Sequence, residues 1–119
     1  MLQRPKILIV EHDDFLREIL GNLLHKKGNY ILSGFCIEKT LEEAAGKHIH
    51  LVILGTSCER YEGEKTIHYL RKRLGEHLIF YLINHQQEPI SFLGKEHQIA
   101  ITELSIQKII HDVTTLLGA

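Results

Sequence analysis

Two polar clusters in this chain follow apolar runs directly and contain residue types that could bind a cation or an anionic group. Glu11-His12-Asp13-Asp14 comes after the run Lys6–Val10, and Gly55-Thr56-Ser57 comes after Leu51–Leu54. Carboxylate oxygens are the ligands that hard cations such as Mg²⁺ prefer. Polar groups at the carboxyl ends of buried parallel strands lie where open α/β sheets bind their ligands. The first cluster therefore indicates a functional crevice, and the question is whether that crevice is still active.

The elements that would position these clusters are short apolar strands alternating with amphipathic helices. Apolar runs without alternation predict strands buried on both faces. The predicted strands are Lys6–Val10, Tyr30–Phe35 at an edge, Leu51–Leu54, Leu78–Ile83 and Ile99–Ile101. The predicted helices start at an Asp14 cap, at a capping box Thr40–Glu43 that ends at Gly46, at Glu62 and at a Ser105 cap, with one short or irregular helix within Asn84–Gln98.

This order of elements predicts the fold class α/β. Five β-α units favour a flavodoxin-like (βα)5 three-layer sandwich with a parallel sheet in the order 2-1-3-4-5. The switch point then lies between the first and third strands, so that Glu11–Asp14 and Gly55–Ser57 face each other. Residues 1–119 are expected to form a single domain, because the chain has 119 residues and shows no linker or repeat.

Composition excludes several classes of function. The formal net charge is −1, which argues against direct nucleic-acid binding. No apolar run approaches the roughly 20 residues of a membrane span, and no signal peptide is evident, so we expect a cytoplasmic protein without membrane contact. Cys36 and Cys58 are expected to be free thiols, since two strand spacings, roughly 9–10 Å, would separate them, beyond the disulfide reach of about 7 Å.

Histidine is abundant, with nine residues in the chain. The best candidates for metal ligands are His48, His50 and His12. However, no His-x-x-x-His or Cys-x-x-Cys spacing occurs. We therefore expect neither a metal site nor a cofactor.

The chain resembles the receiver domains of bacterial two-component response regulators along essentially its whole length. The residues that carry the resemblance are Lys6-Ile-Leu-Ile-Val, Asp14-Phe-Leu-Arg-Glu-Ile-Leu and Leu51-Val-Ile-Leu-Gly-Thr-Ser-Cys-Glu-Arg-Tyr-Glu-Gly63. The resemblance implies a site in which two acids after the first strand hold Mg²⁺ beside a phosphoacceptor aspartate on the third strand. A lysine on the fifth strand neutralises the phosphoryl charge.

Matched position by position, this site is degenerate. Glu11 keeps the first acid, but His12 replaces the second, and the phosphoacceptor position is Gly55, which has no side chain. The lysine falls on Thr102, and the switch hydroxyl falls near Ile83 or Asn84. Asp13 could substitute as a metal ligand, although a role in loop solvation is favoured. We expect a pseudo-receiver that is not an enzyme.

The leading hypothesis from the resemblance is a phosphorylation-independent protein-interaction module in bacterial signal transduction. The expected partner is a separate protein or a fused output domain. The family's face of helix four, strand five and helix five, here roughly Glu88–Leu117, would make these contacts or form a homodimer. A second hypothesis is sensing of a small ligand, a nucleotide or a flavin, in space that Gly55 would open. A third, least favoured, is phosphotransfer through His12.

Overall fold

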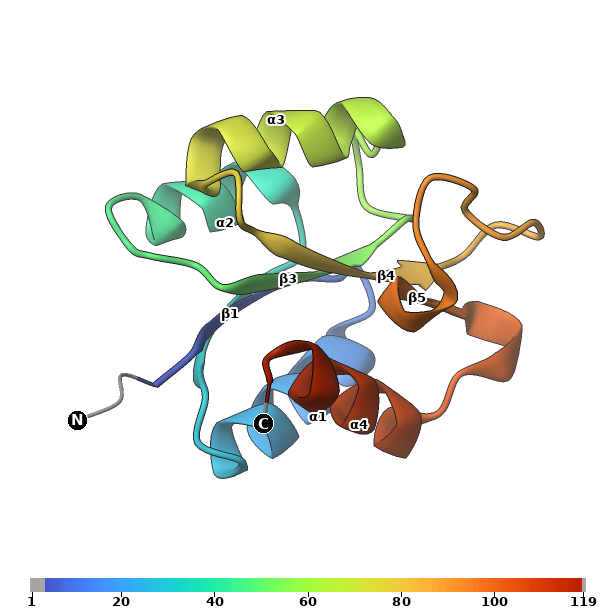
Figure 1. Cartoon of the computed structure of the whole chain (residues 1–119), viewed down its shortest axis with the longest axis horizontal. Helices are drawn as coiled ribbons and strands as arrows, with labels where there is room; N and C mark the ends of the chain where they lie inside the picture. Colours follow the sequence, from blue (N-terminus) through green and yellow to red (C-terminus); the bar gives the residue numbers. More distant parts are fainter. Residues whose placement is uncertain (1–3, 119) are drawn as a thin grey trace.

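The computed structural model describes residues 4–118 and contains a five-stranded parallel sheet between two layers of helices (Figure 1). The strand order is β2-β1-β3-β4-β5, as the sequence predicts. In chain order the elements are β1 Lys6–Val10, α1 Asp14–Lys26, β2 Tyr30–Gly34, α2 Ile37–Ala44, β3 Leu51–Gly55, α3 Glu64–Leu74, β4 Ile79–Asn84, β5 Gln98–Ala100 and α4 Ile106–Leu116. Helices α2 and α3 cover one face of the sheet, and α1 and α4 cover the other.

The apolar strand runs are explained by this two-sided covering. In β1, Leu8 and Val10 pack in the core beneath α2 and α3, whereas Ile7 and Ile9 pack in the core against α1 and α4. Because successive side chains of a strand point to opposite faces, a strand covered on both faces has no polar positions. Every residue of β3 is buried for the same reason.

Two predicted helix starts are wrong. Helix α1 is capped by Asp13 rather than Asp14: its Oδ1 accepts the Leu16 N–H at 2.9 Å. The supposed capping box at Thr40 lies inside α2, which begins at Ile37. The Thr40 hydroxyl donates to the carbonyl of Cys36, four residues earlier, at 2.5 Å. This hydrogen bond to the backbone lets the threonine lie inside the helix rather than cap it.

The ends of five other elements also differ slightly from the prediction. Strand β2 ends at Gly34 rather than Phe35, and β4 is Ile79–Asn84 rather than Leu78–Ile83. Helix α3 begins at Glu64 rather than Glu62, and β5 is Gln98–Ala100, with Ile101 in a following 3-10 turn. Strand β3 extends through Gly55. The predicted Ser105 cap of α4 is confirmed, since Ser105 Oγ accepts the Lys108 N–H at 3.2 Å.

The connection between β4 and β5 contains no α-helix within the described chain, so four α-helices are present where the five-unit pattern has five. The expected short or irregular helix is a single 3-10 turn, Lys95–His97. The Gln98 side chain holds the preceding loop by three hydrogen bonds. Its oxygen accepts the Ile90 N–H at 2.9 Å, and its amide nitrogen donates to the carbonyls of Ile90, at 2.9 Å, and Leu93, at 3.1 Å. This connection is therefore an ordered loop.

Cys36 and Cys58 are both free thiols, as predicted. Across residues 4–118, no helix combines the length and apolar character needed to cross a membrane.

Candidate functional site

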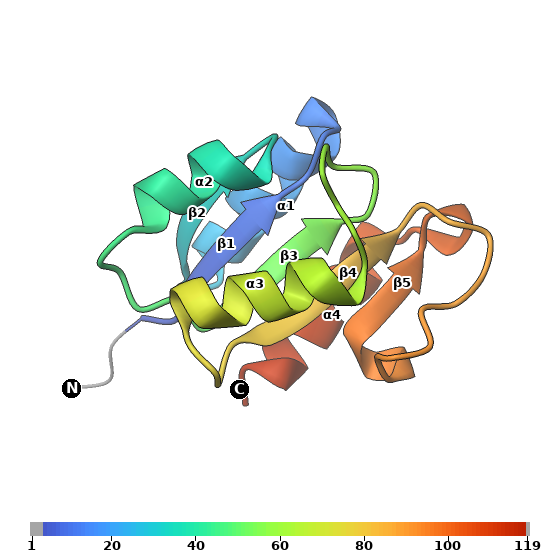
Figure 2. The same ribbon diagram turned by 90° about the horizontal axis from the view of Figure 1, so that it is seen from above.

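The carboxyl ends of β1, β3 and β4 meet at one edge of the sheet, which is the predicted crevice (Figure 2). Strand register sets this meeting: Val10 of β1 pairs with Leu54 of β3, and Gly55 pairs with Ile83 of β4. Glu11, Gly55 and the residues after Ile83 therefore come together although they are far apart in the sequence. The predicted positions of Glu11 and Gly55 across the switch point are confirmed.

Glu11 is the centre of this site, and its side chain is completely buried. One carboxylate oxygen, Oε2, accepts the Asp13 N–H at 2.7 Å. The other, Oε1, lies 3.2 Å from His85 Nε2. A carboxylate oxygen accepts a hydrogen bond in this contact when the imidazole Nε2 carries a proton. Two donors thus compensate the burial of Glu11.

The lack of a side chain at Gly55 leaves room for the Glu11 carboxylate. A Cβ atom placed on Gly55 would overlap Glu11 Oε1 and lie 3.0 Å from Glu11 Cδ. The Glu11 carboxylate therefore occupies the space into which a side chain at position 55 would extend. The expectation that Gly55 opens space for a small ligand is wrong, because that space is filled.

His85 is the site residue that the sequence reasoning missed. It is the first residue after β4, and its backbone N–H donates to Thr56 Oγ1 at 2.9 Å. Thr56 is itself buried and donates its backbone N–H to the Ile83 carbonyl at 3.0 Å. The sequence signal for His85 is its position directly after an apolar strand.

Cys58 forms a buried wall of the site. Its thiol donates to the Val10 carbonyl at 3.4 Å. Burial, and next the negative charge of Glu11, raise the pKa of this thiol to about 11. Cys58 is therefore held in the protonated form, which is a poor nucleophile.

Within residues 4–118, the side chains of the other predicted site residues form no hydrogen bond with the Glu11 carboxylate. His12 and Thr102 are exposed, and Thr102 lies in the 3-10 turn after β5. Asp13 is occupied as the cap of α1. Asn84 is buried, but its amide donates to the Glu88 carbonyl at 2.8 Å and its oxygen accepts the Gln86 N–H at 2.9 Å. It therefore shapes the loop after β4.

The side chains around Glu11 were searched for cationic partners and for groups of metal ligands. Within residues 4–118, no lysine or arginine side chain contacts the Glu11 carboxylate; Arg17 donates to the Glu11 backbone carbonyl, at 2.7 Å. The described residues also contain no group of three or more His, Cys, Asp or Glu arranged to hold a metal ion. The arrangement fits a sealed structural core and offers no nucleophile at position 55.

The two histidines before β3 pack on each other away from this edge. The rings of His48 and His50 lie 4.6 Å apart and nearly perpendicular. His50 Nδ1 accepts the Lys6 N–H at 3.0 Å. Burial, and next the charges of His48 and Lys6, lower the pKa of His50. This geometry gives the pair a structural role in joining the chain before β3 to β1.

Comparison with solved structures places the fold among receiver domains. The signal receiver domain of an HD domain-containing protein from Pseudomonas fluorescens Pf-5 is 15% identical, with a TM-score of 0.78 over 97% of this chain and 95% of that one. A response regulator from Thermotoga maritima is 13% identical, with a TM-score of 0.75 over 98% and 100% of the two chains.

The N-terminal domain of a response regulator/sensory box/GGDEF three-domain protein from Carboxydothermus hydrogenoformans is 20% identical, with a TM-score of 0.72 over 94% of this chain and 93% of that one. No protein-family model matches the sequence, and no curated protein matches it. At these identities the likeness establishes the receiver fold.

Proposed function

We propose that this chain is a pseudo-receiver, a signal-transduction domain that acts through protein contacts without aspartyl phosphorylation. One observation carries the proposal: position 55 has no side chain, and the buried Glu11 carboxylate fills the space that a phosphoacceptor would need. Phosphoryl transfer to a carboxylate requires an accessible nucleophile and cations that neutralise the transferred charge. The proposal is supported by the lack of a side chain at Gly55 and by the lack, within residues 4–118, of a lysine or arginine side chain in contact with the Glu11 carboxylate. Binding, rather than catalysis, is the proposed activity.

The proposed partner is an output domain or a separate signalling protein in the bacterial cytoplasm. Among the neighbours in fold are a DNA-binding response regulator of the LuxR family from Staphylococcus aureus and the three-domain protein named above. In this chain the surface for such contacts would include the β4–β5 loop, β5 and α4. Phe92 and Leu104, which are 36% and 37% exposed, offer apolar contact area there.

The test is chemical phosphorylation followed by intact-mass measurement. The protein is incubated with acetyl phosphate and Mg²⁺ beside a receiver that retains its aspartate. We expect the comparison receiver to gain one hydroxylamine-sensitive phosphoryl group and this protein to gain none, because Gly55 offers no oxygen. A hydroxylamine-sensitive adduct on any residue of this protein would overturn the proposal.

A further inference from the structure

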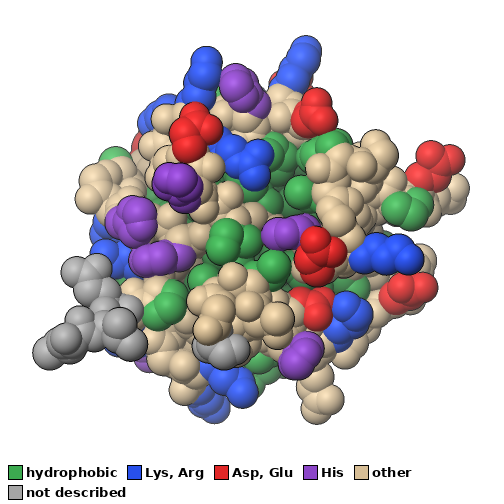
Figure 3. All heavy atoms as spheres, viewed as in Figure 1, with side chains coloured by type: hydrophobic (Ala, Val, Ile, Leu, Met, Phe, Trp, Pro, Cys, Tyr) green, Lys and Arg blue, Asp and Glu red, His purple; other side chains and the backbone are tan. Residues whose placement is uncertain are grey.

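A groove lies between α3 and the β4–β5 loop, on the side of the sheet that α2 and α3 cover. Its volume is about 490 Å³. In the space-filling view, hydrophobic surface is visible between the upper helix and the loop on the right (Figure 3). The groove exists because this connection contains no α-helix that could pack beside α3.

The floor of the groove is apolar. Ile67 from α3 is buried, Leu93 from the loop packs on the same core, and the Phe92 ring is 36% exposed. An exposed phenylalanine ring beside two aliphatic side chains leaves apolar surface in contact with water. Burying that surface against a partner would be favourable. The described chain leaves this ring uncovered, on a loop that Gln98 holds in place.

The rim of the groove carries the positive charges of Lys65 and Arg71. Lys65, His68 and Arg71 line it, with Glu64 as the one carboxylate. Neither Lys65 nor Arg71 has an ion-pair partner among residues 4–118. Arg71 instead stands over the Phe80 ring, 5.1 Å from its centroid. A partner carboxylate would therefore meet unpaired positive charge along α3.

Helix stability explains only part of this charge. Cations in the last turn of α3, such as Arg71, complement the helix dipole. Lys65 lies in the first turn, where the dipole favours negative charge, so helix formation does not account for it. A cation at this position that also lines an apolar groove fits recognition of an anionic partner better than it fits helix stability.

We propose that the groove binds an acidic amphipathic helix of a partner protein, lying beside α3 where the β4–β5 loop leaves the layer of helices incomplete. The proposal rests on the proposed function of the chain as an interaction module and names the chemistry of the partner. α3 has 11 residues, or about 16 Å of helix at 1.5 Å per residue, so a partner helix of about three turns would span the groove. Apolar residues at i, i+3/i+4 and i+7 would face Phe92, with carboxylates flanking them.

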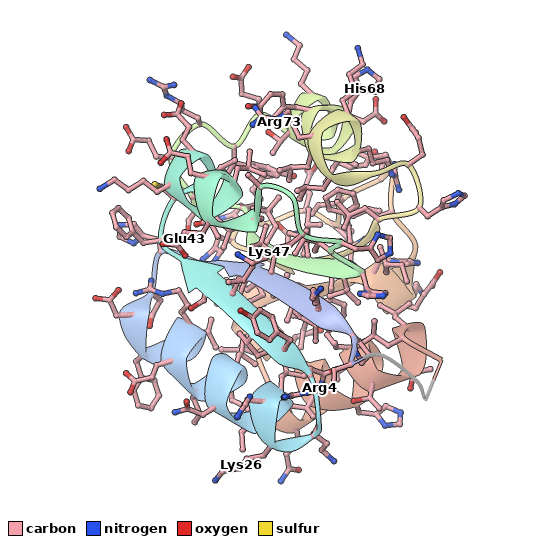
Figure 4. All side chains as sticks on the ribbon, turned by 90° about the vertical axis from the view of Figure 1, so that its left-hand side faces the viewer. Arg4, Lys26, Glu43, Lys47, His68 and Arg73 are labelled. Carbon is pink, nitrogen blue, oxygen red and sulfur yellow. The ribbon has the colours of Figure 1, made fainter. Side chains whose placement is uncertain are left out.

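The test is selection of phage-displayed random peptides of about 16 residues, long enough for four helical turns. Selected peptides are measured by fluorescence anisotropy against the wild type and single-site variants. Lys65→Glu and Phe92→Ala change the groove. Lys26→Glu on α1 is the matched control, because it makes the same charge change on the opposite side of the molecule from His68 (Figure 4). Leu104→Asp tests the surface near α4.

We expect the selected peptides to carry excess Asp and Glu with helical apolar spacing. Both groove variants should weaken their binding at least tenfold, while Lys26→Glu should change it less than twofold. Neutral or basic peptides, equal effects of Lys65→Glu and Lys26→Glu, or no enrichment would each overturn the groove proposal. If Leu104→Asp alone abolishes binding, the groove proposal fails and the interaction module stands. Detection of a hydroxylamine-sensitive phosphoryl group in the phosphorylation test would overturn the proposed function, independently of the peptide results.

Discussion

The overlap between Gly55 and Glu11 predicts that adding one methyl group at position 55 destabilises the protein. Glycine to alanine in a strand normally gains roughly 0.5–1 kcal/mol. Here the Cβ of Gly55→Ala would overlap Glu11 Oε1 and displace a buried carboxylate from the Asp13 N–H and from His85. Each hydrogen bond to a charged group contributes about 1.5–3 kcal/mol. Loss of one of them therefore outweighs the usual gain, and unfolding free energy should fall by about 1–2 kcal/mol.

Gly55→Asp separates the charge effect from the steric one. The new carboxylate would lie beside Glu11, and two like charges about 4 Å apart repel by about 4 kcal/mol at an effective dielectric of 20. This repulsion also raises carboxyl pKa values and opposes an added phosphoryl group. Gly55→Asp should therefore be less stable than Gly55→Ala and label with acetyl phosphate slowly. Adding His12→Asp and Thr102→Lys should raise the initial labelling rate above that of the single variant.

The predicted loss of stability in Gly55→Ala is measured by urea unfolding of a double-mutant cycle that combines it with Glu11→Ala. In a Glu11→Ala background the obstacle is gone, so Gly55→Ala should become neutral or stabilising, with a coupling energy above about 1 kcal/mol. Gly21→Ala is the control: its added Cβ would lie 3.7 Å from Ile31, an ordinary contact, in the interior of α1. It should gain up to about 1 kcal/mol. A Gly55→Ala protein as stable as the wild type, or a coupling energy below about 0.5 kcal/mol, would refute the reasoning.

Three further outcomes are expected. Mg²⁺ should bind negligibly, because Glu11 is sealed and Asp13 caps a helix; calorimetry giving sub-millimolar affinity would contradict this. In the folded protein a thiol reagent should modify Cys36 and leave Cys58, whose pKa is raised to about 11, unmodified until denaturant is added. The lowered pKa of His50 means that the unfolded chain binds more protons as pH falls below the ordinary value of 6.5. Stability should therefore decline with falling pH through that range, and less steeply in His50→Asn when urea midpoints are compared between pH 7.5 and 5.

The sequence by itself determined the layers of the fold, because short uninterrupted apolar runs are typical of strands covered on both faces. The alternation of these runs with amphipathic segments also determined the parallel sheet and its order. Helix starts were less well determined. Thr40 has the residue type of a helix cap, yet its hydroxyl donates to a backbone carbonyl inside α2. Residue type alone therefore could not distinguish a cap position from a position inside the helix.

At the site, the sequence determined that position 55 has no side chain and that position 102 is an uncharged threonine. Only the tertiary structure decided which group lies beside Gly55. Parallel register brings Glu11 and His85 together over Gly55, although they are 74 residues apart. The buried Glu11 carboxylate occupies the space beside Gly55, where it finds two hydrogen-bond partners within the fold. Such a pairing depends on distances between strands in three dimensions, and no local pattern in the sequence encodes it.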